Sequence, residues 1–119
     1  MFLWIGPKGI ITPLHHDLTH NLFVQIYGRK RFRLIPALQV PYMYNHAHVF
    51  CRVDLLDPQP ENFPAFVKTG MIDITVEPGD FLYIPAGWWH HVVGETTSIS
   101  LSFINIARIP NHFVDWPTT

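Results

Sequence analysis

Short runs of alternating apolar and polar residues make up most of this chain, and proline and glycine separate them. A period of two places successive side chains on opposite faces of a strand, whereas a helix repeats every 3.6 residues. Eleven prolines and seven glycines leave little room for long helices in the 119 residues. We therefore predict strands at residues 2–5, 10–14, 21–27, 30–35, 71–76, 81–84, 89–93 and 98–106.

The connections between these strands differ in length. Gly28 and Arg29 separate two adjoining strands and predict a hairpin. Residues 37–66 are rich in proline and asparagine and contain only short apolar pieces, so we predict a long excursion with one or two helical turns. Many short strands of this kind favour an all-β fold, a sandwich or jelly-roll barrel, as one domain over residues 1–119.

Composition narrows the classes of protein that fit. The chain is 48% hydrophobic and 14% charged, which predicts a packed core rather than disorder. Eight lysines and arginines against nine acidic residues give a net charge of -1, so no nucleic-acid partner is expected. Cys51 stands alone, no apolar run reaches membrane-spanning length, and the N-terminal residues lack the pattern of a signal peptide. We expect a cytoplasmic location and no membrane partner.

Alternation also assigns side chains to faces in residues 29–34. The three arginines of this strand share one face, which we interpret as solvated, while Lys30 shares the other face with Phe32 and Leu34. A buried ammonium is costly unless a negative group meets it, and no carboxylate lies near Lys30 in sequence on that face. Its partner is either a bound ligand or, as an equal alternative, a distant carboxylate or the solvent at the barrel rim.

Two other strands give weaker signals. Ser98, Ser100 and Ser102 share a face that either lines a site or meets water, and for Ser98 we expect water. Residues 21–27 carry large apolar side chains on both faces. Such a strand is covered on both sides or lacks part of its cover, so a homo-oligomer is expected.

Three residues have the chemistry of a metal site. His15 and Asp17 project to the same side at the end of a strand, while His16 projects to the other. With His90 they make two imidazoles and one carboxylate, the facial triad of non-haem Fe(II) oxygenases. A His-x-Asp pair alone is weak evidence. The inward Lys30 and the PGD and IP segments before His90 strengthen it.

Four segments in combination point to a known family: TPLHHD at 12–17, NLFVQIYGRK at 21–30, PGD at 78–80 with IP at 84–85, and WWHH at 88–91. Over residues 4–103 the chain resembles the JmjC and cupin-like Fe(II)- and 2-oxoglutarate-dependent oxygenases, especially the asparaginyl hydroxylase that modifies hypoxia-inducible factor. The resemblance implies a double-stranded β-helix barrel. It also implies hydroxylation of a C–H bond in a protein side chain or small molecule by O2, with conversion of 2-oxoglutarate to succinate and CO2.

Carried over by position, the resemblance makes His15, Asp17 and His90 the iron ligands. It places Lys30 and Thr12 on the distal carboxylate of the 2-oxoglutarate cosubstrate. Formal charges agree with this assignment, because Fe(II), Asp17, the 2-oxoglutarate dianion and Lys30 sum to zero. The dianion is therefore favoured over neutral competitors.

The inner wall matches the family less closely. Asn21 matches a further polar contact to the cosubstrate, whereas Ser102 stands where the asparaginyl hydroxylase has an amide and Ile104 where it has an aromatic residue. These departures fit either a different substrate or a weakened site. Family members usually carry further elements before the matched segment, which leaves open a barrel incomplete at its N-terminal side. Two alternatives remain: an inactive or Zn(II)-binding cupin-like module, and a cupin enzyme that does not use 2-oxoglutarate.

Overall fold

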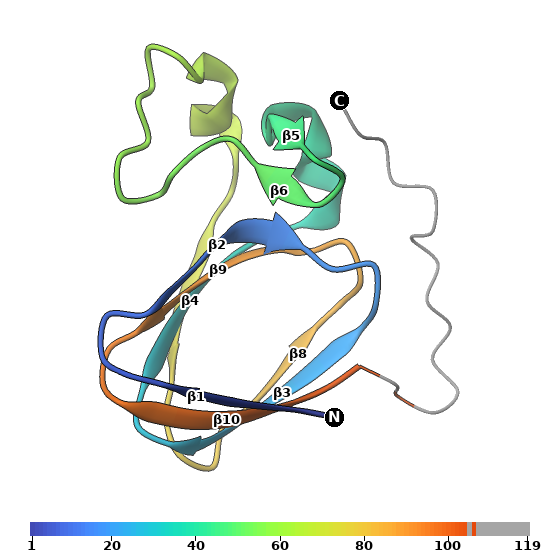
Figure 1. Cartoon of the computed structure of the whole chain (residues 1–119). Coiled ribbons are helices and arrows are strands. Elements are labelled where there is room, and N and C mark those ends of the chain that lie inside the picture. The colour runs from blue at the N-terminus through green and yellow to red at the C-terminus, as the bar shows by residue number, and fades with distance from the viewer. Residues whose placement is uncertain (105, 107–119) are drawn as a thin grey trace.

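Two antiparallel sheets face each other in the computed structural model, which describes residues 1–104 and 106 (Figure 1). A cavity open to solvent lies between them. In order across the four-stranded sheet lie β1 (Phe2–Gly6), β10 (Ser98–Phe103), β3 (Asn21–Tyr27) and β8 (Phe81–Ile84). In order across the six-stranded sheet lie β5 (Asn45–His46), β6 (Phe50–Cys51), β2 (Ile11–His16), β9 (Trp89–Gly94), β4 (Lys30–Ile35) and β7 (Ile72–Val76).

The chain changes sheet at every connection except those from β4 to β7, which all lie in the six-stranded sheet. It crosses between the sheets at each step from β1 to β4 and again at each step from β7 to β10. Strands that follow one another in sequence therefore face each other across the interior, which is the arrangement of a jelly roll. The predicted all-β jelly-roll fold is confirmed.

Most predicted strands have the expected bounds, and β3, β4 and β8 match to the residue. β2 runs two residues beyond its predicted end because His15 continues the pairing, opposite His90 on β9 and Phe50 on β6. β10 ends at Phe103, before the predicted end at 106, and residue 105 of that prediction lies outside the described residues. The predicted hairpin at Gly28 and Arg29 is wrong, because β3 and β4 lie in different sheets and do not pair. Gly28 instead adopts a φ of 70° in the turn that leads from one sheet to the other, a conformation that suits glycine.

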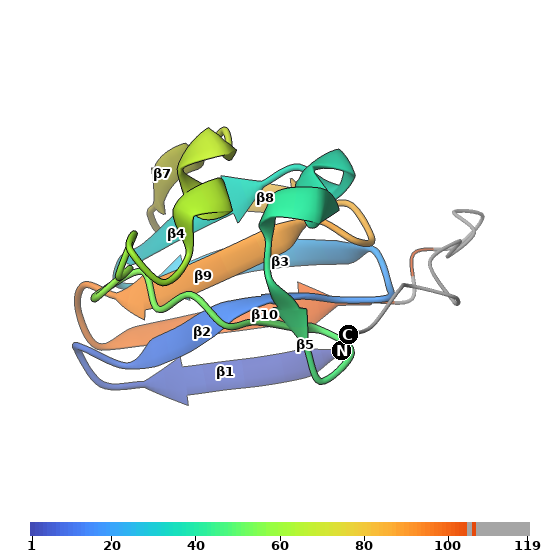
Figure 2. The ribbon, with the colours of Figure 1, turned by 90° about the horizontal axis from the view of Figure 1, so that it is seen from above.

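The long excursion lies over the outer face of the six-stranded sheet (Figure 2). It contains two short 3-10 helices, η1 (Ala37–Tyr42) and η2 (Pro64–Lys68), as expected for one or two helical turns. It also contains the hairpin of β5 and β6, which the sequence pattern did not predict because two-residue strands are too short to show alternation. A core beneath it is formed by Leu14, Ile35, Met43 and Trp89.

A second core lies between the two sheets. It is formed by Phe23, Phe32, Leu34, Val76 and Ile84, and the rings of Phe23 and Phe32 meet edge to face at 4.8 Å. Phe23, Phe32 and Ile84 also line the cavity between the two sheets. The cavity wall is therefore part of the packed interior, which holds the side chains around it in fixed positions.

The serines of β10 correct one expectation. Ser98 is 0% exposed, so the expectation that it faces water is wrong. β10 lies between β1 and β3 in its sheet, and its alternate side chains Ser98, Ser100 and Ser102 all point to the interior. Ser100 Oγ donates a hydrogen bond to Gln25 Oε1 at 2.8 Å.

The opposite face of the four-stranded sheet is apolar and open to solvent. Leu3, Ile5, Ile26 and Phe81 are 59%, 68%, 46% and 69% exposed. This agrees with the two-sided apolar pattern noted for residues 21–27. Within the described part of the chain, no helix is long and apolar enough to cross a membrane.

Candidate metal centre

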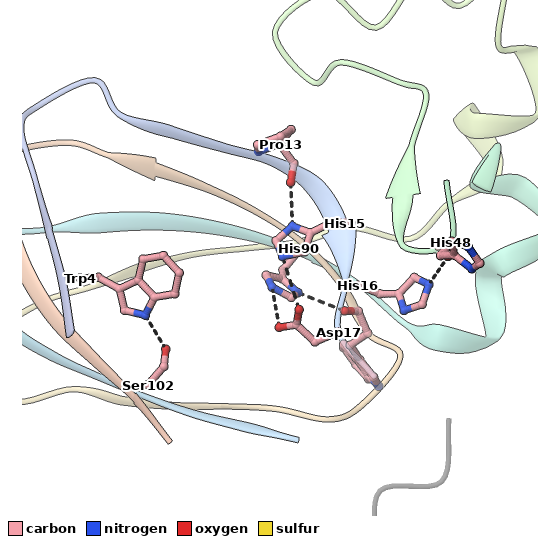
Figure 3. A network of polar contacts seen from close by, with 9 residues as sticks. Trp4, Pro13, His15, His16, Asp17, His48, His90 and Ser102 are labelled. Atoms are coloured by element: carbon pink, nitrogen blue, oxygen red, sulfur yellow. Dashed lines mark hydrogen bonds and ion pairs between the residues drawn. The ribbon is translucent and has the colours of Figure 1, made fainter. Parts of the chain in front are cut away.

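The register of two neighbouring strands brings the histidines together. β2 and β9 pair so that His15 lies opposite His90, and Asp17 follows β2 directly. His15 Nε2 is 3.7 Å from Asp17 Oδ1, and His90 Nε2 is 3.5 Å from Asp17 Oδ2 (Figure 3). Ligand atoms of all three side chains lie within 4.8 Å of one another. This spacing fits three ligands of one divalent cation.

Hydrogen bonds fix the tautomers of both histidines. His15 Nδ1 is 2.8 Å from the carbonyl oxygen of Pro13, and His90 Nδ1 is 3.1 Å from that of Trp88. A carbonyl oxygen only accepts, so each Nδ1 carries the proton and donates it. The Nε2 lone pairs are left facing Asp17, which is the arrangement that a metal-binding imidazole requires.

Burial and backbone contacts complete the metal centre. Burial, together with the neighbouring His15, lowers the pKa of His90 to about 4, so His90 is neutral at pH 7, as a metal ligand must be. Gly87 N–H donates to the carbonyl of Asp17 at 2.8 Å, which ties the loop after β2 to the turn before β9. The Asp17 side chain is 39% exposed and that of His90 only 6%, so the centre opens toward solvent at Asp17.

The other histidines near this centre do not join it. His16 points to the opposite side of β2, as alternation predicts, and its Nε2 lies 3.2 Å from the carbonyl oxygen of His48 (Figure 3). Its ring meets the Trp89 ring edge to face at 4.5 Å. Among residues 1–104 and 106, the one cluster with metal-ligand spacing is His15, Asp17 and His90.

The metal centre opens into the cavity between the sheets. The cavity has a volume of about 130 Å3. Every site residue predicted from the sequence lines it: Thr12, His15, Asp17, Asn21, Lys30, His90 and Ser102. The structure thus brings these side chains around one space, while their individual roles in binding stay predictions.

Two polar groups in the cavity wall lack the partners they need. Lys30 is 8% exposed, and its ammonium lies 5.4 Å from the centre of the Phe23 ring. No carboxylate of the described residues lies within 4 Å of it, and burial lowers its pKa. Asn21 Oδ1 is buried with no hydrogen-bond partner in the described structure. The cavity wall therefore offers the Lys30 cation to a ligand.

Trp4 lines the same cavity, and the sequence did not indicate it. Its Nε1 donates to Ser102 Oγ at 3.0 Å, and the side chain is 51% exposed on the edge strand β1 (Figure 3). Residues 2–5 are all apolar, so alternation could not show which of them points inward. The pairing of β1 with β10 decides it.

A family of known proteins matches almost the whole described chain. Residues 1–106 match the family described as a cupin-like domain. The chain belongs to the cupin-like domain family. This cupin-like domain is 38% identical over 104 residues to Jumonji C domain-containing protein 5 of Drosophila melanogaster, covering 84% of this chain and 26% of that protein. It is 39% identical over 104 residues to lysine-specific demethylase JMJ30 of Arabidopsis thaliana, covering 84% and 24%.

One more relative and one solved structure are also similar to this chain. The human HSPB1-associated protein 1 is 37% identical over 97 residues, covering 76% of this cupin-like domain and 20% of that protein. The chain thus spans about a quarter of the length of these curated relatives. A cupin superfamily protein from Desulfitobacterium hafniense superposes with a TM-score of 0.50 at 15% identity, covering 84% of this chain and 60% of that one. This likeness confirms the cupin fold.

Proposed function

We propose that this cupin-like domain is an Fe(II)- and 2-oxoglutarate-dependent oxygenase that hydroxylates a C–H bond of a protein side chain or small molecule. One observation carries the proposal: the His15, Asp17 and His90 cluster shares its cavity with a buried Lys30 that has no carboxylate partner within the described residues. The relatives support it, because one of them is named a lysine-specific demethylase and another a Jumonji C protein.

The donor set of the cavity fits both iron and 2-oxoglutarate. The Nε2 atoms of His15 and His90 and the carboxylate of Asp17 would hold Fe(II). Lys30 would meet the distal carboxylate of 2-oxoglutarate, and Thr12 would donate a hydrogen bond to it. A charge-assisted hydrogen bond of this kind contributes about 1.5–3 kcal/mol.

The residues of the cavity would orient the metal-binding imidazoles and exclude water from the reacting groups. When bound, iron and 2-oxoglutarate supply the oxidising chemistry with O2, and 2-oxoglutarate leaves as succinate and CO2. Phe23, Phe32 and Val92 give the cavity apolar walls, which exclude water from the reacting groups. The hydrogen bonds from His15 and His90 to backbone carbonyls hold both imidazoles in the metal-binding tautomer throughout.

The alternative readings fit these observations less well. A structural zinc site takes four protein ligands, whereas the described residues bring three together beside an open cavity. A cupin enzyme without an anionic ligand would leave the buried ammonium of Lys30 without a partner in the same cavity. We favour a hydroxylase over a demethylase on the resemblance to the asparaginyl hydroxylase, with O2 and a protein or small molecule as its partners.

Succinate formation tests the proposal. Purified protein loaded anaerobically with Fe(II) is given 2-oxoglutarate and then air, and succinate is followed by NMR with and without candidate peptides. Asp17→Ala should lose both iron, measured by elemental analysis, and succinate formation. His46→Ala, which removes an exposed histidine outside the metal centre, should retain both. Succinate no higher than in Asp17→Ala under all conditions would refute the proposal.

A further inference from the structure

The cavity of the metal centre is also open to solvent between β1 and β2. Among the residues that line it, Trp4 on β1 and Thr12 on β2 are exposed. The apolar residues of its other walls are buried, with Phe23 at 5%, Phe32 at 1% and Ile84 at 2% exposure. A ligand in this cavity therefore has Trp4 as the apolar wall on its solvent side.

Strand pairing and one hydrogen bond hold Trp4 in this place. In the pairing of β1 with β10, Trp4 lies opposite Ser100 and Phe2 opposite Ser102, and directly opposite residues share a face of the sheet. Both serines are buried in the interior, so Trp4 points inward as well. Its Nε1 donates to Ser102 Oγ at 3.0 Å, which fixes the orientation of the indole ring (Figure 3).

Packing of the protein core does not account for this tryptophan. Trp4 belongs to neither of the two hydrophobic cores of the described residues. β1 is the edge strand of its sheet, and the residue is 51% exposed although its ring is held inward. A large apolar ring that is fixed at a cavity and still meets water offers surface for a ligand to cover.

The cosubstrate of the proposed function has apolar atoms that this surface suits. 2-Oxoglutarate carries two methylene groups between its oxo-acid end, which would lie at the metal centre, and its distal carboxylate, which would meet Lys30. The cavity has a volume of about 130 Å3, whereas pockets that bury a whole drug-sized ligand have about 300–1,000 Å3. A molecule of this size therefore fills most of the space and reaches the wall that Trp4 forms.

We propose that Trp4 is a binding residue of this cavity, which covers the methylene groups of 2-oxoglutarate on the solvent side, and that Ser102 is the residue that positions its ring. This inference rests on the proposed function. Binding takes apolar surface of the indole out of water, and because the hydrogen bond to Ser102 orients the ring beforehand, little side-chain freedom is lost on binding. Ser102 thus acts on the cosubstrate through Trp4.

Fluorescence and calorimetry test the role of Trp4 without turnover. The full chain is loaded with Zn(II), which has no redox chemistry, and titrated with 2-oxoglutarate. Tryptophan emission of the wild type should shift to shorter wavelength as binding saturates, and Trp4→Phe, which keeps the other three tryptophans, should show no shift. Trp4→Ala should raise the dissociation constant about tenfold, the effect of about 50 Å2 of apolar surface, and Trp4→Phe should recover part of this loss.

A matched control and a double-mutant cycle complete the test. Ile5→Ala changes the next residue of β1, which is 68% exposed and does not line the cavity, and should leave the affinity unchanged. Ser102→Ala should raise the dissociation constant about threefold in the wild type but not in Trp4→Ala, as expected for two coupled residues. An equal effect in both backgrounds would overturn the positioning role of Ser102.

The outcomes separate this inference from the proposed function. Urea unfolding establishes that each variant is folded, and if Trp4→Ala is not, Trp4→Leu replaces it and should weaken binding in the same direction. Calorimetric binding with equal affinity in the wild type and in these variants, or without any emission shift, would overturn the role of Trp4 alone. A wild-type protein that binds no 2-oxoglutarate with Zn(II), Mn(II) or Fe(II) would overturn both proposals.

Discussion

Replacement of Lys30 by methionine tests whether this side chain binds 2-oxoglutarate beside the metal centre. The substitution keeps an unbranched chain of similar length and removes only the ammonium, which is buried near Phe23 with no carboxylate partner in the described structure. In the proposed complex this ammonium meets the distal carboxylate of 2-oxoglutarate. Loss of about 1.5–3 kcal/mol corresponds to a dissociation constant about 10- to 150-fold higher.

The same variant should be more stable than the wild type without cosubstrate. Desolvation lowers the pKa of Lys30 in the folded protein below its ordinary value of 10.5, so folding works against the charged form at pH 7. The contact with the Phe23 ring offsets part of this cost, which leaves a gain of about 1–2 kcal/mol for Lys30→Met. The gain should shrink as pH rises through the folded pKa toward 10.5, because the wild-type folded state then loses its proton.

Calorimetry and denaturation measure the two effects separately. Mn(II)-loaded protein is titrated with 2-oxoglutarate, and urea unfolding of metal-free protein is followed at pH 7 and at higher pH. Arg31→Met is the matched control, since it removes a cation from the outer face of the same strand, where Arg31 pairs with Asp73. An unchanged affinity together with unchanged or lower stability in Lys30→Met would refute the assignment of this lysine to a ligand.

Three further predictions concern stability and association. Burial and His15 hold the pKa of His90 near 4, below its ordinary value of 6.5. Metal-free protein should therefore lose stability as pH falls from about 6.5 toward 4, because over this range only the unfolded chain takes up the proton. A urea midpoint that stays constant over this range would contradict the prediction. Phe32→Ala removes a fully buried ring and should lower the free energy of unfolding by about 3–5 kcal/mol in the same assay, and a loss below about 1 kcal/mol would disagree. The exposed apolar face of the four-stranded sheet predicts that the protein forms a homo-oligomer in sedimentation velocity. Ile26→Lys should shift this oligomer toward the monomer, and a wild-type protein that is monomeric at all concentrations would contradict the prediction.

The alternation of apolar and polar residues along each strand determined several strand bounds and the faces on which side chains lie, without any tertiary contact. It set the bounds of β3, β4 and β8, and it put Lys30 on the same face as Phe32. It also put His15 and Asp17 on one side and His16 on the other. These are local properties, because successive side chains of an extended backbone point in opposite directions whatever the strand packs against.

Which face became the interior, and which distant residues met there, was decided only by the tertiary structure. The pairing of β2 with β9 sets His15 opposite His90, and a slip of one residue would turn one of them to the other face. The burial of Ser98 and the inward position of Trp4 follow from neighbouring strands. Alternation assigns a side chain to one of two faces, but only packing against other elements removes one face from water.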